Sequence, residues 1–446
     1  MNPRLDLLRP YPFERLRALL AGQRPPENRS PIQLSIGEPR HPSPPFVRQA
    51  LADSLGSGLS SYPATLGRED LRTTLATWLC SRFRLATLDP ATQVIPTLGS
   101  REALFSLAQS VLNPLESDAL VICPNPFYQI YEGAALLGGA QPWFLNIRPD
   151  ASRVCDVRDV PADLWPRVRL VFTCSPGNPT GVVMTLDDWQ RLFDLSDRHG
   201  FVIAADECYS EIYFDQAQPP LGALEAAQRL GRPDFRNLVV LGSLSKRSNV
   251  PGLRSGYAAG DAAILKRFVL YRTYHGSAMS PSVQMASQEA WRDEAHVVEN
   301  RRLYREKFLL FREVLGDLLP LQMPAAGFYF WVRTPLDDQT FARRLFAEEN
   351  VTVLPGSFLA REAHGVNPGA DHIRIALVSS VAECREAAER IREFMQRLQA
   401  EGSVPARPAR AASLSPDVLS PDVLSSDVLS PEVLPPDVLP RVTLPS

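Results

Sequence analysis

The chain has 446 residues, of which 45% are hydrophobic and 22% charged, and its formal net charge is -3. This composition is typical of a globular protein with a large buried core, and the near-neutral charge excludes a basic surface for nucleic acid or an anionic membrane. No apolar run reaches the ~18 residues of a membrane span, and the charged N-terminal stretch lacks a signal-peptide core, so we expect a cytoplasmic protein.

The N-terminal part of the chain predicts an irregular start followed by two helices. Residues 1–45 are rich in proline and irregular apart from a short amphipathic beginning. Apolar spacing then predicts helices over residues 46–57 and 67–83, with the stretch SSYPATLG as the loop between them.

From residue 91 onward, short apolar runs alternate with amphipathic helices. The runs cover residues 119–123, 169–174, 201–206 and 237–243. Such runs separated by helices predict an α/β fold with a mostly parallel sheet covered by helices on both faces. Each run ends at a polar or turn motif (CPNPFYQ, CSPGNPTG, ADECYSE and SLSKRSN), and ligands of such sheets bind at the carboxyl ends of strands. The four motifs therefore predict one shared cleft.

A second pattern begins near residue 280. Long helices over residues 282–316 are followed by the strands GFYFWV, VTVLPG and HIRIALV and by the closing helix VAECREAAERIREFMQRLQA. We expect a large domain over 46–280 and a smaller α/β domain over 281–400, with the N-terminal segment 1–45 packing near the smaller one.

The last segment, residues 401–446, differs in composition from the rest. A five-residue repeat of the type SPDVL runs from Ser415 to Leu439. Its period matches no solenoid unit, and proline recurs where a helix or a central strand needs an N–H group. We predict a disordered low-complexity tail, and the alternative is a short linear binding motif.

Cysteine and histidine do not form a metal-binding pattern. Neither the six cysteines nor the six histidines show the spacing of metal ligands, so we expect reduced, packing thiols and no metal. The cysteines are Cys80, Cys123, Cys155, Cys174, Cys208 and Cys384.

Lysine is rare in this chain and occurs at positions 246, 266 and 307 only. Lys246 follows an apolar run, in the stretch SLSKRSNVPGLRSG. A lysine amine forms an imine with an aldehyde, which an arginine cannot do, whereas the alternative for Lys246 alone is a surface lysine on a loop. Lys266 and Lys307 have charged neighbours on expected helices, and we expect both at the surface.

The residues around Lys246 predict an anion site. Ser243, Ser245 and Arg254 offer two hydroxyls and a guanidinium around one point, which suits a phosphate group. Gly99, Ser100 and Arg101 stand at an expected helix N-terminus, where backbone N–H groups and the helix dipole favour an anion. The alternative role for Ser100 is a plain helix cap.

Other strand ends carry groups that suit an aromatic cofactor. Asp206 ends a buried strand, where a carboxylate needs a partner: a salt bridge or cap, or a protonated ring nitrogen. Tyr209 and Asn178 suit a ring hydroxyl, and Tyr128 or Phe127 suits a ring face, with aromatic core packing as the alternative. Pyridoxal phosphate requires this set together with an imine lysine and a phosphate cradle.

The motifs SPGNPTG, ADECYSEIYF, SLSKRSNVPGLRSGY and HIRIALV, in this order and spacing, resemble the class I and II aminotransferases over about residues 30–398. The resemblance implies the fold-type-I architecture of pyridoxal-phosphate enzymes. The stretch SLSKRSNVPGLRSG is most similar to that of N-succinyldiaminopimelate aminotransferases, which act in bacterial lysine and diaminopimelate biosynthesis.

This resemblance implies a role for each cofactor residue. Lys246 would be the Schiff-base lysine and the proton shuttle. Asp206 would hold the ring nitrogen, Asn178 and Tyr209 would contact the ring hydroxyl, and Tyr128 would stack on the ring. The phosphate would be held by Ser243, Ser245, Arg254, Ser100 and the backbone of Arg101.

The resemblance also implies substrate contacts and a partner subunit. Arg374 resembles the arginine that grips the substrate α-carboxylate, with Asn178 also near the substrate, and Gly37, in the motif SIGEP, would lie close to it. Tyr62 resembles the tyrosine that reaches the phosphate of the neighbouring subunit, which requires a homodimer with sites at the interface.

The implied reaction is a transamination between glutamate and N-succinyl-2-amino-6-oxopimelate. The distal carboxylate of that substrate needs a cation, for which Arg40, Arg247 and Arg272 are the candidates. The alternatives are a broad aspartate, alanine or aromatic aminotransferase, a carbon–sulfur β-lyase and, more distantly, a regulator that binds the cofactor without turnover.

Overall fold

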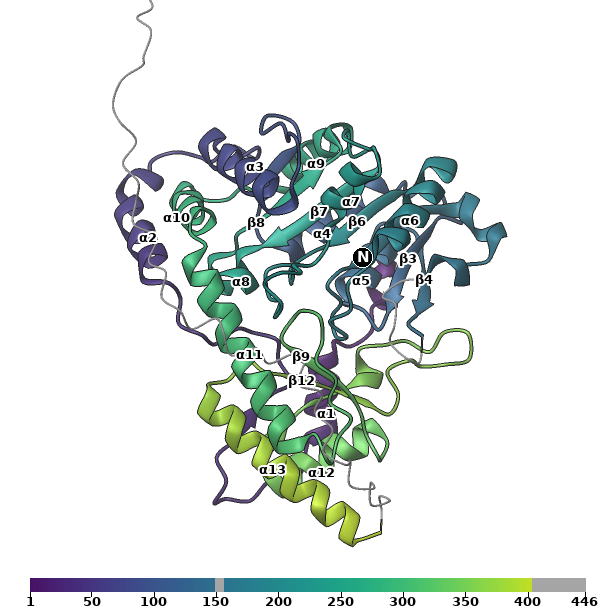
Figure 1. Ribbon diagram of the computed structural model, residues 1–446. Coiled ribbons are helices and arrows are strands. Elements are labelled where there is room, and N and C mark those ends of the chain that lie inside the picture. Colours follow the sequence, from purple (N-terminus) through teal and green to yellow (C-terminus); the bar gives the residue numbers. More distant parts are fainter. Residues whose placement is uncertain (149–155, 403–446) are drawn as a thin grey trace, which may run out of the picture. The chain divides into compact units, whose positions relative to one another are not determined.

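The computed structural model describes residues 1–148 and 156–402, which fold as one compact unit (Figure 1). The predicted tail repeat and Cys155 lie outside these residues. Within them, no helix has the length and apolar character that a membrane crossing needs, and no group of three or more histidine, cysteine or acidic side chains is arranged to hold a metal ion.

A seven-stranded sheet forms the larger part of the unit, with the strand order β2-β8-β7-β6-β5-β3-β4. Its strands are β2 (Val94–Thr97), β3 (Leu120–Asn125), β4 (Gln141–Asn146), β5 (Val168–Cys174), β6 (Val202–Asp206), β7 (Leu238–Ser243) and β8 (Gly256–Gly260). The strands from β7 to β4 are parallel, and β8 is antiparallel to both β7 and β2. The four predicted runs are confirmed as β3, β5, β6 and β7, whereas β2, β4 and β8 were not predicted.

Helices bury both faces of this sheet, which confirms the predicted α/β architecture. Alternate residues of one strand point to opposite cores: in β6, Ile203 packs with the helices of one face and Ala204 with those of the other. One face is covered by α3 (Glu69–Phe83), α6 (Leu186–His199), α7 (Ala223–Arg229) and α10 (Pro281–Arg292), and the other by α4 (Ser100–Val111), α5 (Ile130–Leu137) and α9 (Ala262–His275).

A smaller sheet lies beyond α11 in the chain and has the order β11-β12-β9 (Figure 1). The expected helical stretch 282–316 divides into α10 and α11 (Ala295–Leu315), and the closing helix is α13 (Val381–Ala400). The other elements here are β9 (Tyr329–Arg333), α12 (Asp338–Glu349), β10 (Val351–Thr352), β11 (Leu354–Pro355), η5 (Gly356–Phe358) and β12 (His372–Ala376).

The N-terminal segment is hydrogen-bonded to this smaller part. In β1 (Ile32–Gln33), Ile32 pairs with Val351 of β10 in parallel register, and the Leu34 carbonyl accepts from the Ala376 N–H. The chain then carries residues 36–41 toward the large sheet. The remaining short elements are η1 (Pro3–Leu7), α1 (Pro12–Leu20), α2 (Pro45–Gly58), η2 (Val157–Asp159), η3 (Ala162–Arg167), α8 (Leu244–Arg247) and η4 (Pro251–Leu253). The division into domains at residues 46–280 and 281–400 stays a prediction.

Candidate active site

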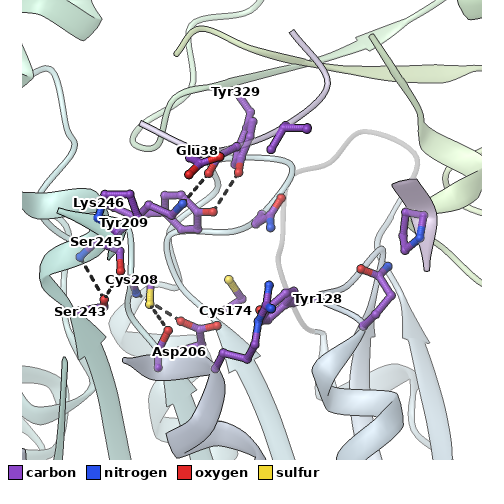
Figure 2. A pocket seen from close by; sticks show the side chains of 18 of the residues that line it. Glu38, Tyr128, Cys174, Asp206, Cys208, Tyr209, Ser243, Ser245, Lys246 and Tyr329 are labelled. Carbon is purple, nitrogen blue, oxygen red and sulfur yellow. Dashed lines mark hydrogen bonds between the residues drawn. The ribbon is translucent and has the colours of Figure 1, made fainter. Parts of the chain in front are cut away.

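A cavity of about 520 Å³ opens at the carboxyl ends of β5, β6 and β7 (Figure 2). Tyr62 lies outside this cavity and its side chain is fully exposed. The residues to which the family resemblance gave a role otherwise line it: Gly37, Ser100, Arg101, Tyr128, Asn178, Asp206, Tyr209, Ser243, Ser245, Lys246, Arg254 and Arg374. The further candidates Gly99, Phe127, Arg40, Arg247 and Arg272 do not line it.

Lys246 stands in the short helix α8, directly after β7. Its side chain is half-buried, and its Nζ donates a hydrogen bond to the carbonyl of Gly37 and lies 5.4 Å from the centroid of the Phe328 ring. Burial lowers the pKa of Lys246 to about 8, and the charges of Arg374 and Arg101 act in the same direction. At neutral pH, a larger fraction of Lys246 is therefore the neutral, nucleophilic amine than for an ordinary lysine.

Asp206 ends β6 and faces the same cavity from below Lys246 in Figure 2. The hydroxyl of Tyr131 donates to its Oδ2 at 2.7 Å, and the backbone N–H of Cys208 donates to its Oδ1 at 3.3 Å. Burial raises the pKa of Asp206, and the bonds from Tyr131 and Cys208 oppose that rise because they favour the anion. A cationic N–H group in the cavity would complete the set of partners of this carboxylate.

Tyr131 was not predicted, although it lies two residues after the motif CPNPFYQ. It comes from α5, and its ring stacks on Phe172 of β5 at 4.6 Å. A tyrosine three residues after Tyr128, on a helix that covers the sheet, was the available signal.

An anion cradle forms where α4 begins. Gly99 has φ 78° and no side chain caps the helix, so the first backbone N–H groups of α4 lack a side-chain partner. A Cβ at Gly99 would lie 2.4 Å from Arg254 Nη2, so only glycine lets the guanidinium come this close. On the other side, Ser245 N–H donates to Ser243 Oγ at 3.0 Å, and the two hydroxyls are 2.8 Å apart. This donor set suits a phosphate group.

Tyr128 provides an aromatic wall, and its hydroxyl accepts from Arg101 Nε at 2.6 Å. Its neighbour Phe127 is buried against Phe144, with the ring centroids 5.1 Å apart, and does not line the cavity. Of the two aromatic candidates, Tyr128 is therefore the one that can contact a ligand.

Arg374 reaches the cavity from β12 and is buried. Its Nη2 donates to the Ser35 carbonyl at 2.7 Å and its Nη1 to Asn178 Oδ1 at 3.1 Å. Its Nε is buried without a hydrogen-bond partner among the described residues. A buried guanidinium with a donor to spare beside a cavity suits a carboxylate ligand.

Gly37 and Tyr329 meet at the upper wall of the cavity. The hydroxyl of Tyr329 lies 3.0 Å from that of Tyr209, and a Cβ at position 37 would stand 1.8 Å from the Tyr329 oxygen. Tyr329 was not predicted as a site residue, because the expected strand GFYFWV did not indicate which aromatic faces the cavity.

Arg247 and Arg272 were candidates for binding a distal carboxylate, and this prediction is wrong because both side chains are buried in the protein core. Arg247 is fully buried and pairs with Glu294 and with the Ala290 carbonyl at 2.7 Å. Arg272 is fully buried and its Nε donates to Glu102 at 3.0 Å. Arg40 remains exposed, with its Nη1 3.4 Å from Ser379 Oγ.

The prediction that Lys307 lies at the surface is also wrong. Lys307 is only 1% exposed, and its Nζ donates to His41 Nε2 at 2.6 Å and to the Leu377 carbonyl at 3.2 Å. Burial lowers its pKa to about 8. Lys266, in contrast, is exposed on α9 as predicted.

Comparisons with known proteins agree with this geometry. The sequence model of aminotransferase class I and II matches residues 29–391. An LL-diaminopimelate aminotransferase of Syntrophobacter fumaroxidans is 30% identical over 88% of this chain and 98% of its own length. A solved aminotransferase from Neisseria meningitidis is 51% identical with a TM-score of 0.85, covering 89% of this chain and 100% of that one. A probable N-succinyldiaminopimelate aminotransferase from Thermus thermophilus is 28% identical with a TM-score of 0.76, covering 86% of this chain and 99% of that one.

Proposed function

The chain belongs to the class I and II aminotransferase family, whose members depend on pyridoxal phosphate, and from this premise we propose that it exchanges an amino group between glutamate and N-succinyl-2-amino-6-oxopimelate. The observation that carries the proposal is the meeting of Lys246, Asp206 and Arg374 around one cavity. These three groups supply an imine-forming amine, a partner for a ring nitrogen and a carboxylate clamp.

The residues present fit pyridoxal phosphate. The uncapped start of α4, the glycine at position 99 and the guanidinium of Arg254 supply donors for a phosphate. Lys246 and Asp206 line the same cavity, so an amine and a carboxylate are available to the two ends of one ring.

The bound cofactor supplies a carbonyl that takes up the amino group and a ring that withdraws electrons from the substrate Cα–H bond. Lys246 would act as the base that accepts the substrate Cα proton and as the acid that gives a proton back from its Nζ. Its lowered pKa suits both directions, because neutral and protonated amine are both accessible near pH 8.

Asp206 would pair with the protonated ring nitrogen of a bound cofactor. The Tyr131 hydroxyl and the Cys208 N–H hold the carboxylate in place, and both favour its anionic form. Loss of either bond would make Asp206 a weaker partner for a protonated ring nitrogen.

Arg374 fixes the substrate through its α-carboxylate. Two of its nitrogens are already held by Ser35 and Asn178, so the guanidinium is oriented before a ligand arrives. The side-chain amide nitrogen of Asn178 stays available as a donor, since its Oδ1 accepts from Arg374. The volume of the cavity is in the range of sites for drug-sized ligands, which accommodates a long diacid, and Arg40 is our candidate for the distal carboxylate.

A competing substrate is LL-diaminopimelate itself, which is favoured by the name of the relative from Syntrophobacter fumaroxidans. The decisive assay uses 2-oxoglutarate as acceptor and compares N-succinyl-LL-diaminopimelate, LL-diaminopimelate, aspartate and alanine as donors, with glutamate formation as the readout. We expect the highest kcat/KM for the succinylated donor. A higher value for free LL-diaminopimelate would replace the proposed substrate, and comparable values for aspartate or alanine would leave only a broad aminotransferase.

We further propose that two copies of the chain form the enzyme. Tyr62 is fully exposed, and Leu55 and Leu59 on and after α2 are exposed apolar neighbours. A second subunit that covers these side chains would bring Tyr62 to its site. Sedimentation of the holoenzyme tests this, with a monomer of full activity as the contrary result.

A further inference from the structure

A lysine–histidine–asparagine chain, in which Lys307 and Asn300 are buried and His41 is half-buried, ends at the backbone of Lys246. Lys307 Nζ donates to His41 Nε2 at 2.6 Å, and His41 Nδ1 lies 2.7 Å from Asn300 Oδ1. Asn300 Nδ2 donates to the carbonyls of Lys246 and Arg247, each at 3.2 Å. None of these three side chains lines the cavity.

The chemistry at both ends fixes the direction of every hydrogen bond in this chain. A lysine ammonium only donates, so His41 Nε2 must accept, and His41 Nδ1 must carry the proton that goes to Asn300 Oδ1. Backbone carbonyls only accept, so the amide nitrogen of Asn300 must face Lys246. The Asn249 side chain agrees with this orientation, since its Nδ2 donates to the same Asn300 oxygen at 3.0 Å.

A second set of contacts joins His41 to the side chain of Lys246. The His41 ring packs on Tyr304 at 4.5 Å, and Tyr304 stacks on Phe328 at 5.3 Å. The Nζ of Lys246 lies 5.4 Å from the Phe328 centroid. His41 is therefore connected to Lys246 in two ways. Asn300 links it to the Lys246 backbone, and the rings of Tyr304 and Phe328 link it to the Lys246 amine.

The free-energy cost of burying the Lys307 charge indicates that this network has a role beyond packing. Lys307 forms no ion pair with a carboxylate within residues 1–148 and 156–402, and a buried charge without a counter-ion is costly. The Lys307 ammonium nevertheless links three segments near the cavity. It contacts residues 36–41 through His41 and the end of β12 through the Leu377 carbonyl. It is connected to α8 by way of His41 and Asn300.

We propose that Lys307, His41 and Asn300 form a positioning network that fixes the backbone of Lys246 and thereby sets how firmly Lys246 holds the cofactor. The proposal rests on the function proposed above. The side chain of Lys246 has to change partners during turnover, so its Cα needs an anchor that the reaction does not disturb. The network supplies this anchor through the bonds from Asn300 to the carbonyls of Lys246 and Arg247, away from the cavity.

Three single variants and one double variant test the network. Asn300→Ala removes the donors to Lys246, Lys307→Met removes the buried charge, and His41→Phe keeps an aromatic ring against Tyr304 but loses both polar bonds. The control is Ser196→Ala, which also loses a buried hydrogen bond, from Ser196 Oγ to the Phe201 carbonyl, but lies on α6.

The readouts are the dissociation constant of pyridoxal phosphate and the pH midpoint of the visible absorbance of the bound cofactor, with Tm measured beside them. We expect each network variant to weaken cofactor binding by about tenfold and to move the absorbance midpoint. Asn300→Ala removes the donor to two carbonyls, and the other two variants break the hydrogen-bond chain that orients Asn300. The control should lower Tm alone. The double variant His41→Phe/Asn300→Ala should be no worse than the worse single variant, because both break the same chain.

Variants that lower Tm like the control but keep the cofactor affinity and the absorbance midpoint would overturn the network, and so would fully additive effects in the double variant. Should one variant fail to fold, the other two still decide. A wild-type protein that develops no absorbance band with pyridoxal phosphate would instead overturn the proposed function, so the two failures are distinguishable.

Discussion

The hydroxyl oxygens of Tyr209 and Tyr329 lie 3.0 Å apart, and they join the loop after β6 of the large sheet to β9 of the small one. Gly37 faces this pair so closely that any side chain at position 37 would collide with Tyr329. The substrate side of the cavity therefore depends on three residues from three distant parts of the chain.

Replacing Gly37 by alanine should damage the site more than the fold. The added Cβ would stand 1.8 Å from the Tyr329 oxygen, so the tyrosine pair must move, and we expect a loss of at least about tenfold in kcat/KM. Gly56→Ala on α2 is the matched control, because a Cβ there meets nothing within 4 Å. Steady-state kinetics of both variants check this, and an unimpaired Gly37→Ala would show that the tyrosine pair is not part of the site.

Arg374→Lys should impair substrate binding although the charge is kept. A lysine cannot replace the planar guanidinium that contacts Ser35 and Asn178 while leaving its Nε free. We expect a loss of roughly a hundredfold in kcat/KM for the amino donor, as for other buried charge-assisted contacts. The exposed Arg333 of β9 serves as control, since Arg333→Lys should leave the kinetics unchanged. Equal kinetics of the two variants would argue against carboxylate binding by Arg374.

Gly99→Ala should weaken cofactor binding through the phosphate cradle. The new Cβ would lie 2.4 Å from Arg254 Nη2 and displace the guanidinium, so we expect the dissociation constant of pyridoxal phosphate to rise about tenfold. Gly200→Ala shares the strain of a positive φ, 76° against 78°, but meets no atom within 4 Å. Absorbance titration of both proteins separates loss of the cradle from backbone strain. Equal affinities would place the phosphate elsewhere.

The rate at which cofactor-free protein takes up pyridoxal phosphate should depend on pH through Lys246. Because burial lowers the pKa of this lysine to about 8, the neutral amine appears at a lower pH than for an ordinary lysine. We expect the rate of cofactor uptake to rise with pH and to level off above about pH 8. The visible absorbance of the bound cofactor measures this rate. Lys246→Ala should give no band at any pH, and a band in that variant would remove Lys246 from its role.

Protein stability should fall in mild acid because of His41. Burial, followed by the charge of Lys307, lowers the pKa of His41 from 6.5 to about 4 in the folded state. Between these values the unfolded chain binds the proton and the folded chain does not, so stability decreases as the pH falls from 6.5 toward 4. His41→Phe should lose less stability over this interval. Urea unfolding at pH 6.5 and 4.5 measures the difference, and identical losses in the two proteins would contradict it.

The strand ends were predictable because parallel strands present their carboxyl ends at one edge. Asn178, Asp206 and Lys246 follow β5, β6 and β7, which are neighbours in the sheet, so their convergence follows from local sequence and topology. The placement of Arg374 came from its resemblance to a family motif, since nothing local indicates that β12 faces the large sheet.

Residues that act through tertiary packing were missed for the same reason. Lys307 has charged neighbours along the sequence, which suggested the surface, but on α11 it shares one face with Asn300, Tyr304 and Phe311. That face is buried. Helical spacing was a better guide here than sequence neighbours. Tyr329 lies within the predicted strand GFYFWV and Tyr131 within α5, and only the packing of these elements shows that they contact Tyr209 and Asp206.

The pairing of Ile32 with Val351 bears on how the protein is made. A nascent chain that has not yet reached β10 already contains Lys246 and Asp206 but has no strand with which β1 can pair. Residues 36–41 then lack the anchor that the pairing of β1 with β10 gives them, so we expect a vitamin B6 molecule to be fully enclosed only after β10 has been made. Contacts this distant in sequence form slowly, so we expect the closing of the pocket by residues 36–41 to be a late step of folding.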